Sequence, residues 1–203
     1  MRWHWTCPVR NAASTAVPNN LIPRGLCSAP CVLQGGSCVC DGSSYSWDQG
    51  RALGAATFQR LEGCWYGNDR KVYIVSTNGG RGQGQIWVYD PAAETISLLF
   101  QSPGKDVLNK PDHITVSPRG GLVLCEDGGG VQFVRGLTPS GEIFDFAVNQ
   151  LNDAEFAGAC FSPDGGTLFV NIQGDTTGSA TDPGVRGGGM TLAIWGPWEK
   201  GAL

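Results

Sequence analysis

The sequence is poor in charge, in histidine and in long apolar runs, and each shortage excludes a class of protein. Only 16% of the 203 residues are charged, the formal net charge is -4, and two residues are histidine. A nucleic-acid-binding domain carries a basic face, so we expect no nucleic-acid partner. No apolar run approaches the roughly 18 residues of a membrane helix, so we expect no membrane partner. Because the first residues show neither an apolar signal segment nor paired arginines, we expect no export signal.

Glycine and proline are plentiful, with 31 and 12 residues, and cysteine divides the chain in two. This composition favours many turns over long helices. Residues 1–46 are predicted to be an irregular, poorly ordered segment, because they combine Pro, Ser and Asn with no apolar period. A zinc site there is the open alternative, suggested by C-x3-C and C-x-C spacings among Cys7, Cys27, Cys31, Cys38 and Cys40. The other cysteines, Cys64, Cys125 and Cys160, lie in strand-like runs and are predicted to be reduced and buried.

From about Trp47 onward the sequence predicts short β-strands and no helix. Runs such as K-V-Y-I-V-S-T, Q-I-W-V-Y-D-P and G-L-V-L-C-E-D are rich in β-branched and aromatic residues. Turn-forming stretches such as N-G-G and D-P separate these runs. Two of the turns share the frame S-P-x-G-G, and Ser117 and Ser162 are 45 residues apart.

A repeat of this length with about four strands is typical of a β-propeller blade. We therefore predict an all-β fold in which residues 47–203 form a partial propeller. Its three four-stranded antiparallel blades are expected at about 58–101, 113–149 and 157–198, with a β-sandwich as the rival. Three blades do not close a ring, so the fold needs a complementing propeller half or leaves open edges.

Five carboxylates lie beside glycines or at strand boundaries, where the inner strands of a propeller would aim them into a channel. They are Glu62, Asp112, Glu126, Asp127 and Glu155. Carboxylates that converge from several strands suit calcium or another hard cation, and they repel one another without it. Adjacent glycines, as in C-E-D-G-G-G, allow a ligand to approach the backbone closely.

Each carboxylate also has a simpler interpretation. Asp112 follows a proline and fits a turn equally well, and Glu126 and Asp127 fit a solvated strand end. Surface exposure explains Glu62 and Glu155 less well, because apolar residues flank them and burying an unpaired carboxylate is costly. Arg60 could pair with Glu62 or clamp a phosphate.

Many ordered motifs between about residues 49 and 198 resemble the C-terminal half of the PhoX-type alkaline phosphatases. They include R-L-E-G-C-W-Y-G, P-D-H-I-T-V-S-P-R-G-G, L-C-E-D-G, R-G-L-T-P-S-G-E-I-F-D-F-A and E-F-A-G-A-C-F-S-P-D-G-G-T-L-F-V-N-I-Q. The resemblance implies a six-bladed propeller that hydrolyses phosphomonoesters at a cluster of iron and calcium. It implies that Arg60 contacts phosphate and Glu62 binds metal. Asp112, Glu126, Asp127 and Glu155 are the next candidate metal ligands.

The sequence also departs from that family. Residues before Trp47 do not resemble its N-terminal half, which supplies further ligands including a cysteine, and His113 stands where the family often has asparagine. Family members are typically exported. We therefore expect a truncated phosphatase with little activity alone; the alternative is a non-catalytic propeller fragment that binds metal or a protein partner through its open edge.

Overall fold

The computed structural model describes residues 31–34, 37–40, 54–174 and 189–203, and the chain divides into two compact units. The first unit is Met1–Thr57 and the second is Phe58–Leu203. In the first unit, β1 (Cys31–Gln34) pairs with β2 (Ser37–Cys40) in an antiparallel hairpin. The sequence predicted no regular structure for residues 1–46, so these two strands depart from that prediction. The rest of the segment, with Cys7 and Cys27, lies outside the described residues.

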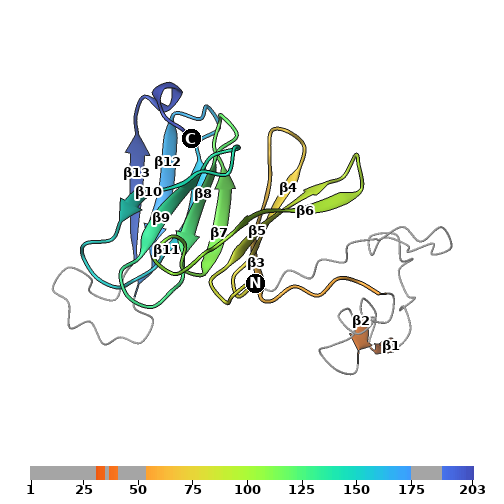
Figure 1. The fold of residues 1–203 in the computed structure, drawn as a ribbon. Coiled ribbons are helices and arrows are strands. Elements are labelled where there is room, and N and C mark those ends of the chain that lie inside the picture. Colours follow the sequence, from red (N-terminus) through yellow and green to blue (C-terminus); the bar gives the residue numbers. More distant parts are fainter. Residues whose placement is uncertain (1–30, 35–36, 41–53, 175–188) are drawn as a thin grey trace. The chain divides into compact units, whose positions relative to one another are not determined.

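The second unit is built from three antiparallel sheets (Figure 1), which confirms the predicted all-β class. The first sheet contains β3 (Leu61–Tyr66), β4 (Val72–Ser76), β5 (Gln85–Asp90) and β6 (Thr95–Gln101). The middle sheet contains β7 (Pro111–Val116), β8 (Leu122–Glu126), β9 (Phe133–Leu137) and β10 (Ile143–Val148). The third sheet contains β11 (Phe156–Phe161), β12 (Thr167–Ile172) and β13 (Met190–Trp195).

Helical structure in the described residues is limited to one 3-10 turn, Trp198–Lys200. No helix in the described part of the chain is long and apolar enough to cross a membrane. The third sheet has three described strands where the sequence predicted four, and residues 175–188, between β12 and β13, are outside the described part.

The repeated S-P-x-G-G stretches form equivalent hairpin turns. The first joins β7 to β8, where the amide of Gly120 donates to Ser117 O at 3.0 Å. The second joins β11 to β12, where the amide of Gly165 donates to Ser162 O at 2.8 Å. In both turns the fourth residue is a glycine with positive φ, 90° at Gly120 and 72° at Gly165, which side chains disfavour. The sequence repeat thus marks the same turn in two consecutive sheets.

The middle sheet is covered on both faces, and its central strand shows this most clearly. All five residues of β8 are buried, because successive side chains point to opposite, equally covered faces. Leu122 and Leu124 join a core cluster with Val75 and Ile86 of the first sheet. Val123 and Cys125 join a second cluster, with Leu168 and Val170 of the third sheet.

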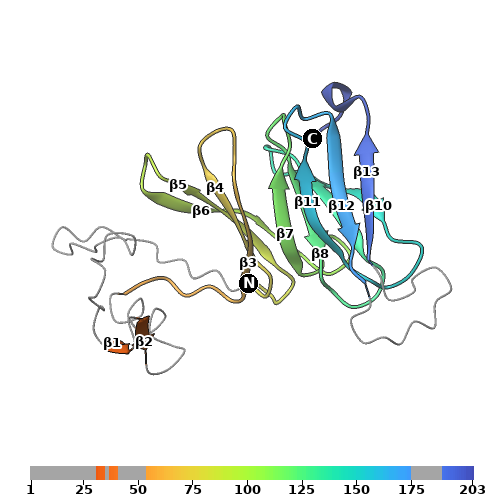
Figure 2. The ribbon, with the colours of Figure 1, turned by 180° about the vertical axis from the view of Figure 1, so that it is seen from behind.

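The first strands of the three sheets lie next to one another in the order β3, β7, β11. Contacts join β3 to β7 and β7 to β11, and both views place β7 between the other two sheets (Figures 1 and 2). His113 of β7 reinforces the second contact, since its Nε2 donates to Ala159 O of β11 at 3.0 Å. Residues at the ends of these three strands are therefore brought close together.

Candidate metal and phosphate site

An equivalent corner occurs at one end of each sheet, and these corners carry the predicted site residues. In each, the residue after the second strand donates its amide to the carbonyl of the residue before the first strand. The bonds, each 2.9 Å long, are Thr77 to Arg60, Asp127 to Lys110, and Gln173 to Glu155. Three of the six residues, Arg60, Asp127 and Glu155, are candidates from the sequence. Because the same backbone arrangement recurs in the three sheets, side chains that are far apart in the sequence lie at equivalent positions.

Bulges at these corners change the direction of the strands. The register shifts between Leu61 and Cys64 in β3, between Pro111 and His113 in β7, and between Ala157 and Cys160 in β11. Such bulges bend a strand and redirect a side chain, and they are common beside active sites. Glu62 and Asp112 lie within the first two.

Gly63 permits the close approach of β3 to β7. A Cβ at this position would lie 2.6 Å from Asp112 O and 2.9 Å from Ile114 N. Both are backbone atoms that cannot move aside, so glycine is required for the two strands to meet. The position of Asp112 in the site therefore depends on a residue of the first sheet.

Three carboxylates converge at the corners: Asp112, Asp127 and Glu155 each offer an oxygen within 4.8 Å of the others. Asp112 Oδ1 and Glu155 Oε2 are buried and have no hydrogen-bond partner in the structure. Buried carboxylate oxygens are normally satisfied, and leaving them unpaired costs free energy. The site therefore has the donor atoms that a hard cation prefers and an unmet need for positive charge.

Burial and mutual repulsion raise the pKa of two of these carboxylates. The pKa of Asp112 rises to about 6, mainly through burial and then through the charges of Asp127 and Glu62. The pKa of Glu155 rises to about 8, through burial and through a hydrogen bond and charge repulsion with Asp127. With its pKa raised to about 8, Glu155 favours the protonated form at neutral pH when no cation is bound.

Arg60 lies beside the three carboxylates and joins two corners. Its Nε donates to Glu62 Oε1 at 2.8 Å, and its terminal nitrogen donates to Asp127 Oδ2 at 2.9 Å. The bond to Asp127 is the main cause of a raised pKa for the Arg60 guanidinium. Arg60 has a φ of 56°, a left-handed conformation that costs a non-glycine residue about 1 to 2 kcal/mol. A strained backbone that presents a charged side chain is typical of functional sites.

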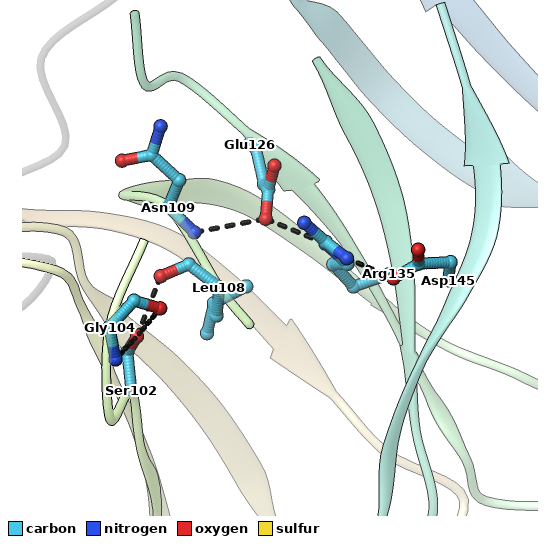
Figure 3. Close-up of polar contacts among 7 residues, drawn as sticks. All are labelled: Ser102, Gly104, Leu108, Asn109, Glu126, Arg135 and Asp145. Carbon is cyan, nitrogen blue, oxygen red and sulfur yellow. Dashed lines mark hydrogen bonds and ion pairs between the residues drawn. The ribbon is translucent and has the colours of Figure 1, made fainter. Parts of the chain in front are cut away.

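The structure does not bring Glu126 into this group. Its carboxylate is buried, accepts from Arg135 Nε at 2.7 Å, and also accepts from the amide of Asn109 at 2.9 Å (Figure 3). Because successive residues of a strand point to opposite faces, Glu126 and its neighbour Asp127 are directed to different surroundings. The sequence interpretation treated them alike.

The network around Glu126 holds the chain that leads into the site (Figure 3). Ser102 Oγ donates to Leu108 O at 2.6 Å and accepts from the amide of Gly104 at 3.3 Å, which closes the preceding loop. Asn109, the residue bonded to Glu126, lies three positions before Asp112. The buried ion pair of Glu126 and Arg135 thus helps to fix the segment that leads from Asn109 to Asp112. Sequence analysis did not single out Arg135, although an arginine in the apolar run Q-F-V-R-G-L needs an acidic partner.

The cysteines of the three sheets are not part of the candidate site. Cys64, Cys125 and Cys160 are free thiols, and Cys125 is fully buried. Burial raises the pKa of the Cys125 thiol to about 12, so it remains protonated. Burial also raises the pKa of Cys64 and lowers the pKa of His113. The oxygen ligands are therefore the groups available to a metal in the described corners.

Comparisons with known proteins agree with the sequence motifs. The family described as alkaline phosphatase PhoX matches residues 41–175, and no curated protein matches the chain. A solved structure of a luciferin-regenerating enzyme is similar over 70% of this chain and 47% of its own length, with 20% sequence identity and a TM-score of 0.48. The chain thus spans about half of that structure, and at this TM-score the similarity supports no argument about fold or activity. Because the family match covers well over half of the residues, this chain belongs to the PhoX alkaline phosphatase family.

Proposed function

We propose that this chain binds a hard cation at Asp112, Asp127 and Glu155 and uses it, with Arg60, to hydrolyse phosphomonoesters. We also propose that its three sheets are blades of a partial β-propeller whose inner strands are β3, β7 and β11. The observation that carries the proposal is the convergence of three carboxylates beside an arginine at equivalent strand ends. Family membership supplies the reaction class.

The three carboxylates fit calcium or ferric iron, both implied by the family, because both accept carboxylate oxygens. The unpartnered oxygens of Asp112 and Glu155 would be ligands, and Asp127 would be shared between the cation and Arg60. A bound cation would polarise a phosphoryl oxygen and favour deprotonation of an attacking water. Glu62, held by Arg60 at 2.8 Å, is proposed as a further ligand once a phosphate occupies the arginine.

Arg60 has the geometry to recognise the substrate. Its guanidinium now donates in two directions, to Glu62 and to Asp127, and its side chain remains 42% exposed. A phosphate monoester offers oxygens that accept both bonds, and a planar guanidinium binds them in a bidentate manner. Arg60 would also neutralise the charge that develops on the phosphoryl group in the transition state.

A second candidate function is cation binding without catalysis. The side chains of Arg60 and Asp127 are 42% and 32% exposed, so this side of the site is open to water. An open site weakens the electrostatic interactions on which phosphoryl transfer depends. This candidate shares the cation site with the first and differs in predicting no turnover.

The test is hydrolysis of an aryl phosphate by the chain with added calcium and ferric iron. We expect slow, metal-dependent release of the phenol, reduced by about 100-fold or more in Arg60→Ala, because a lost charge donor costs that much in related sites. Arg70→Ala is the matched control, since Arg70 is exposed on the turn between β3 and β4. Calcium binding without turnover would favour the second candidate, and turnover unchanged in Arg60→Ala would contradict the proposed role of Arg60.

A further inference from the structure

Thr77 is buried at the corner of the first sheet, and its hydroxyl has no partner. This residue directly follows β4, and its exposed fraction is 0%. Its amide donates to Arg60 O at 2.9 Å, but its Oγ1 is buried and makes no hydrogen bond. Buried hydroxyl groups normally have a partner, so one without a partner calls for an explanation.

Thr77 is the counterpart of Asp127 in the repeated corners. Each follows the second strand of its sheet, and each donates its amide to the residue before the first strand. Asp127 lies two positions after Cys125, which packs in the core with residues of the third sheet, and its carboxylate reaches that of Glu155. Thr77 thus has in the first sheet the position that a proposed cation ligand has in the middle sheet.

The side chain of Thr77 faces the middle sheet, to which Asp112 belongs. Val75, two positions before Thr77, packs in a core cluster with Ile114 of β7, and residues two apart on a strand point to the same side. Strands β4 and β7 are in contact; β4 runs toward the corner and β7 runs away from it. Thr77 Oγ1 and Asp112 Oδ1 are therefore two buried, unpartnered polar atoms at the same end of neighbouring strands.

We propose that Thr77 is a positioning residue for Asp112: its hydroxyl donates a hydrogen bond to Asp112 Oδ1 when a cation occupies the carboxylate cluster. The inference rests on the proposed cation site but not on phosphate hydrolysis. A carboxylate oxygen has two lone pairs, so Oδ1 can accept this bond and still bind a cation. Neither atom has another partner, so the bond forms without breaking one.

Asp112 is the carboxylate of the cluster that most needs such a donor. Asp127 is held by the guanidinium of Arg60 at 2.9 Å, and Glu155 makes a hydrogen bond with Asp127. Among the described residues, no side-chain hydrogen bond fixes the carboxylate of Asp112. Ligating carboxylates are normally held by hydrogen bonds of their own, and loss of such a bond lowers metal affinity by about 10- to 100-fold.

Calorimetric titration of the full chain with calcium compares the wild type with Thr77→Val, which replaces the hydroxyl by a methyl group of similar shape. We expect calcium affinity to fall about tenfold in Thr77→Val and to change less than about twofold in Thr77→Ser, which keeps the hydroxyl. Thermal unfolding with a chelator should show Thr77→Val to be at least as stable as the wild type, because it loses a buried polar group that has no partner. A residue with only a structural role would not combine undiminished stability with weaker cation binding.

Thr115→Val is the matched control for this exchange. Thr115 of β7 also has an exposed fraction of 0%, and its Oγ1 is also buried without a partner. It lies toward the far end of β7 from the corner, and it points to the face opposite that of Ile114. We expect Thr115→Val to be at least as stable as the wild type and to bind calcium with the same affinity.

Two results would overturn the inference and leave the cation site intact. Equal calcium affinity in the wild type and Thr77→Val would show that the hydroxyl does not act on Asp112. An equal loss of affinity in Thr77→Ser or in Thr115→Val would assign the effect to packing rather than to the hydroxyl at the corner. A wild type that binds no calcium would overturn the cation site and this inference together. Weaker binding in Thr77→Val without phosphate hydrolysis by the wild type would uphold this inference and leave the activity proposal to fail alone.

Discussion

Replacing Arg135 by methionine is expected to lower the free energy of unfolding by about 3 to 5 kcal/mol, because it leaves a buried charge without its partner. Arg135 and Glu126 are 4% and 1% exposed, and Arg135 Nε lies 2.7 Å from Glu126 Oε1. The guanidinium also stacks on the ring of Phe133, 3.9 Å from its centroid, and pairs with Asp145. Urea denaturation measures the change.

A second variant separates the charge from the packing. In Glu126→Gln combined with Arg135→Met, no charge is buried, and the glutamine oxygen can still accept from the amide of Asn109. We expect this double variant to recover part of the loss. Asp145→Asn should cost less than about 1 kcal/mol, because the Asp145 side chain is 63% exposed. A loss below about 1 kcal/mol in Arg135→Met would contradict the structural role given to the pair.

The chain without cations is expected to lose stability as the pH rises from about 4 to about 8. The pKa values of Asp112 and Glu155 are raised in the folded chain, from 3.8 to about 6 and from 4.5 to about 8. The folded state therefore holds these protons more tightly than the unfolded state, and each proton lost with rising pH disfavours folding. For Asp112 alone this shift corresponds to at most about 3 kcal/mol, which solvent screening of the partly exposed carboxylate reduces.

Calcium should suppress this loss, since a bound cation stabilises the ionised carboxylates and the folded state that holds them. The measurement is thermal unfolding between pH 4 and pH 8, with calcium and with a chelator. We expect the two curves to agree near pH 4 and to separate toward pH 8. Identical curves at every pH would mean that the carboxylates are solvated and bind no calcium.

The sequence predicted the strands well because their local signals agree with their packing. The run L-V-L-C is apolar at every position, and β8, which it forms together with Glu126, is covered on both faces. The two S-P-x-G-G turns were recognisable because glycine is needed where φ is positive. The third sheet was less predictable, since a long glycine-rich stretch separates β12 from β13 and local patterns do not tell how such a stretch runs.

The sequence identified most of the residues of the site, but it did not show which of them contact one another. Asp112, Asp127 and Glu155 lie in separate stretches, and each was singled out because it lies beside a glycine or at a strand boundary. Glu126 and Asp127 point to different faces because side chains alternate along β8. A shift of the strand by one residue would exchange their positions, and the sequence does not fix this register. Arg60 was associated with Glu62 by proximity in the sequence, but its bond to Asp127 spans 67 residues and required the arrangement of sheets.

Calorimetric titration of the chain with calcium tests most directly whether Asp112, Asp127 and Glu155 form a cation site. We predict saturable binding by the wild type that weakens at least tenfold in Asp127→Asn, because one of three converging carboxylates is neutralised. Asp106→Asn removes an equal charge from an exposed position outside the cluster and should bind as the wild type does. Absence of binding by the wild type, or equal binding by Asp127→Asn, would contradict the account.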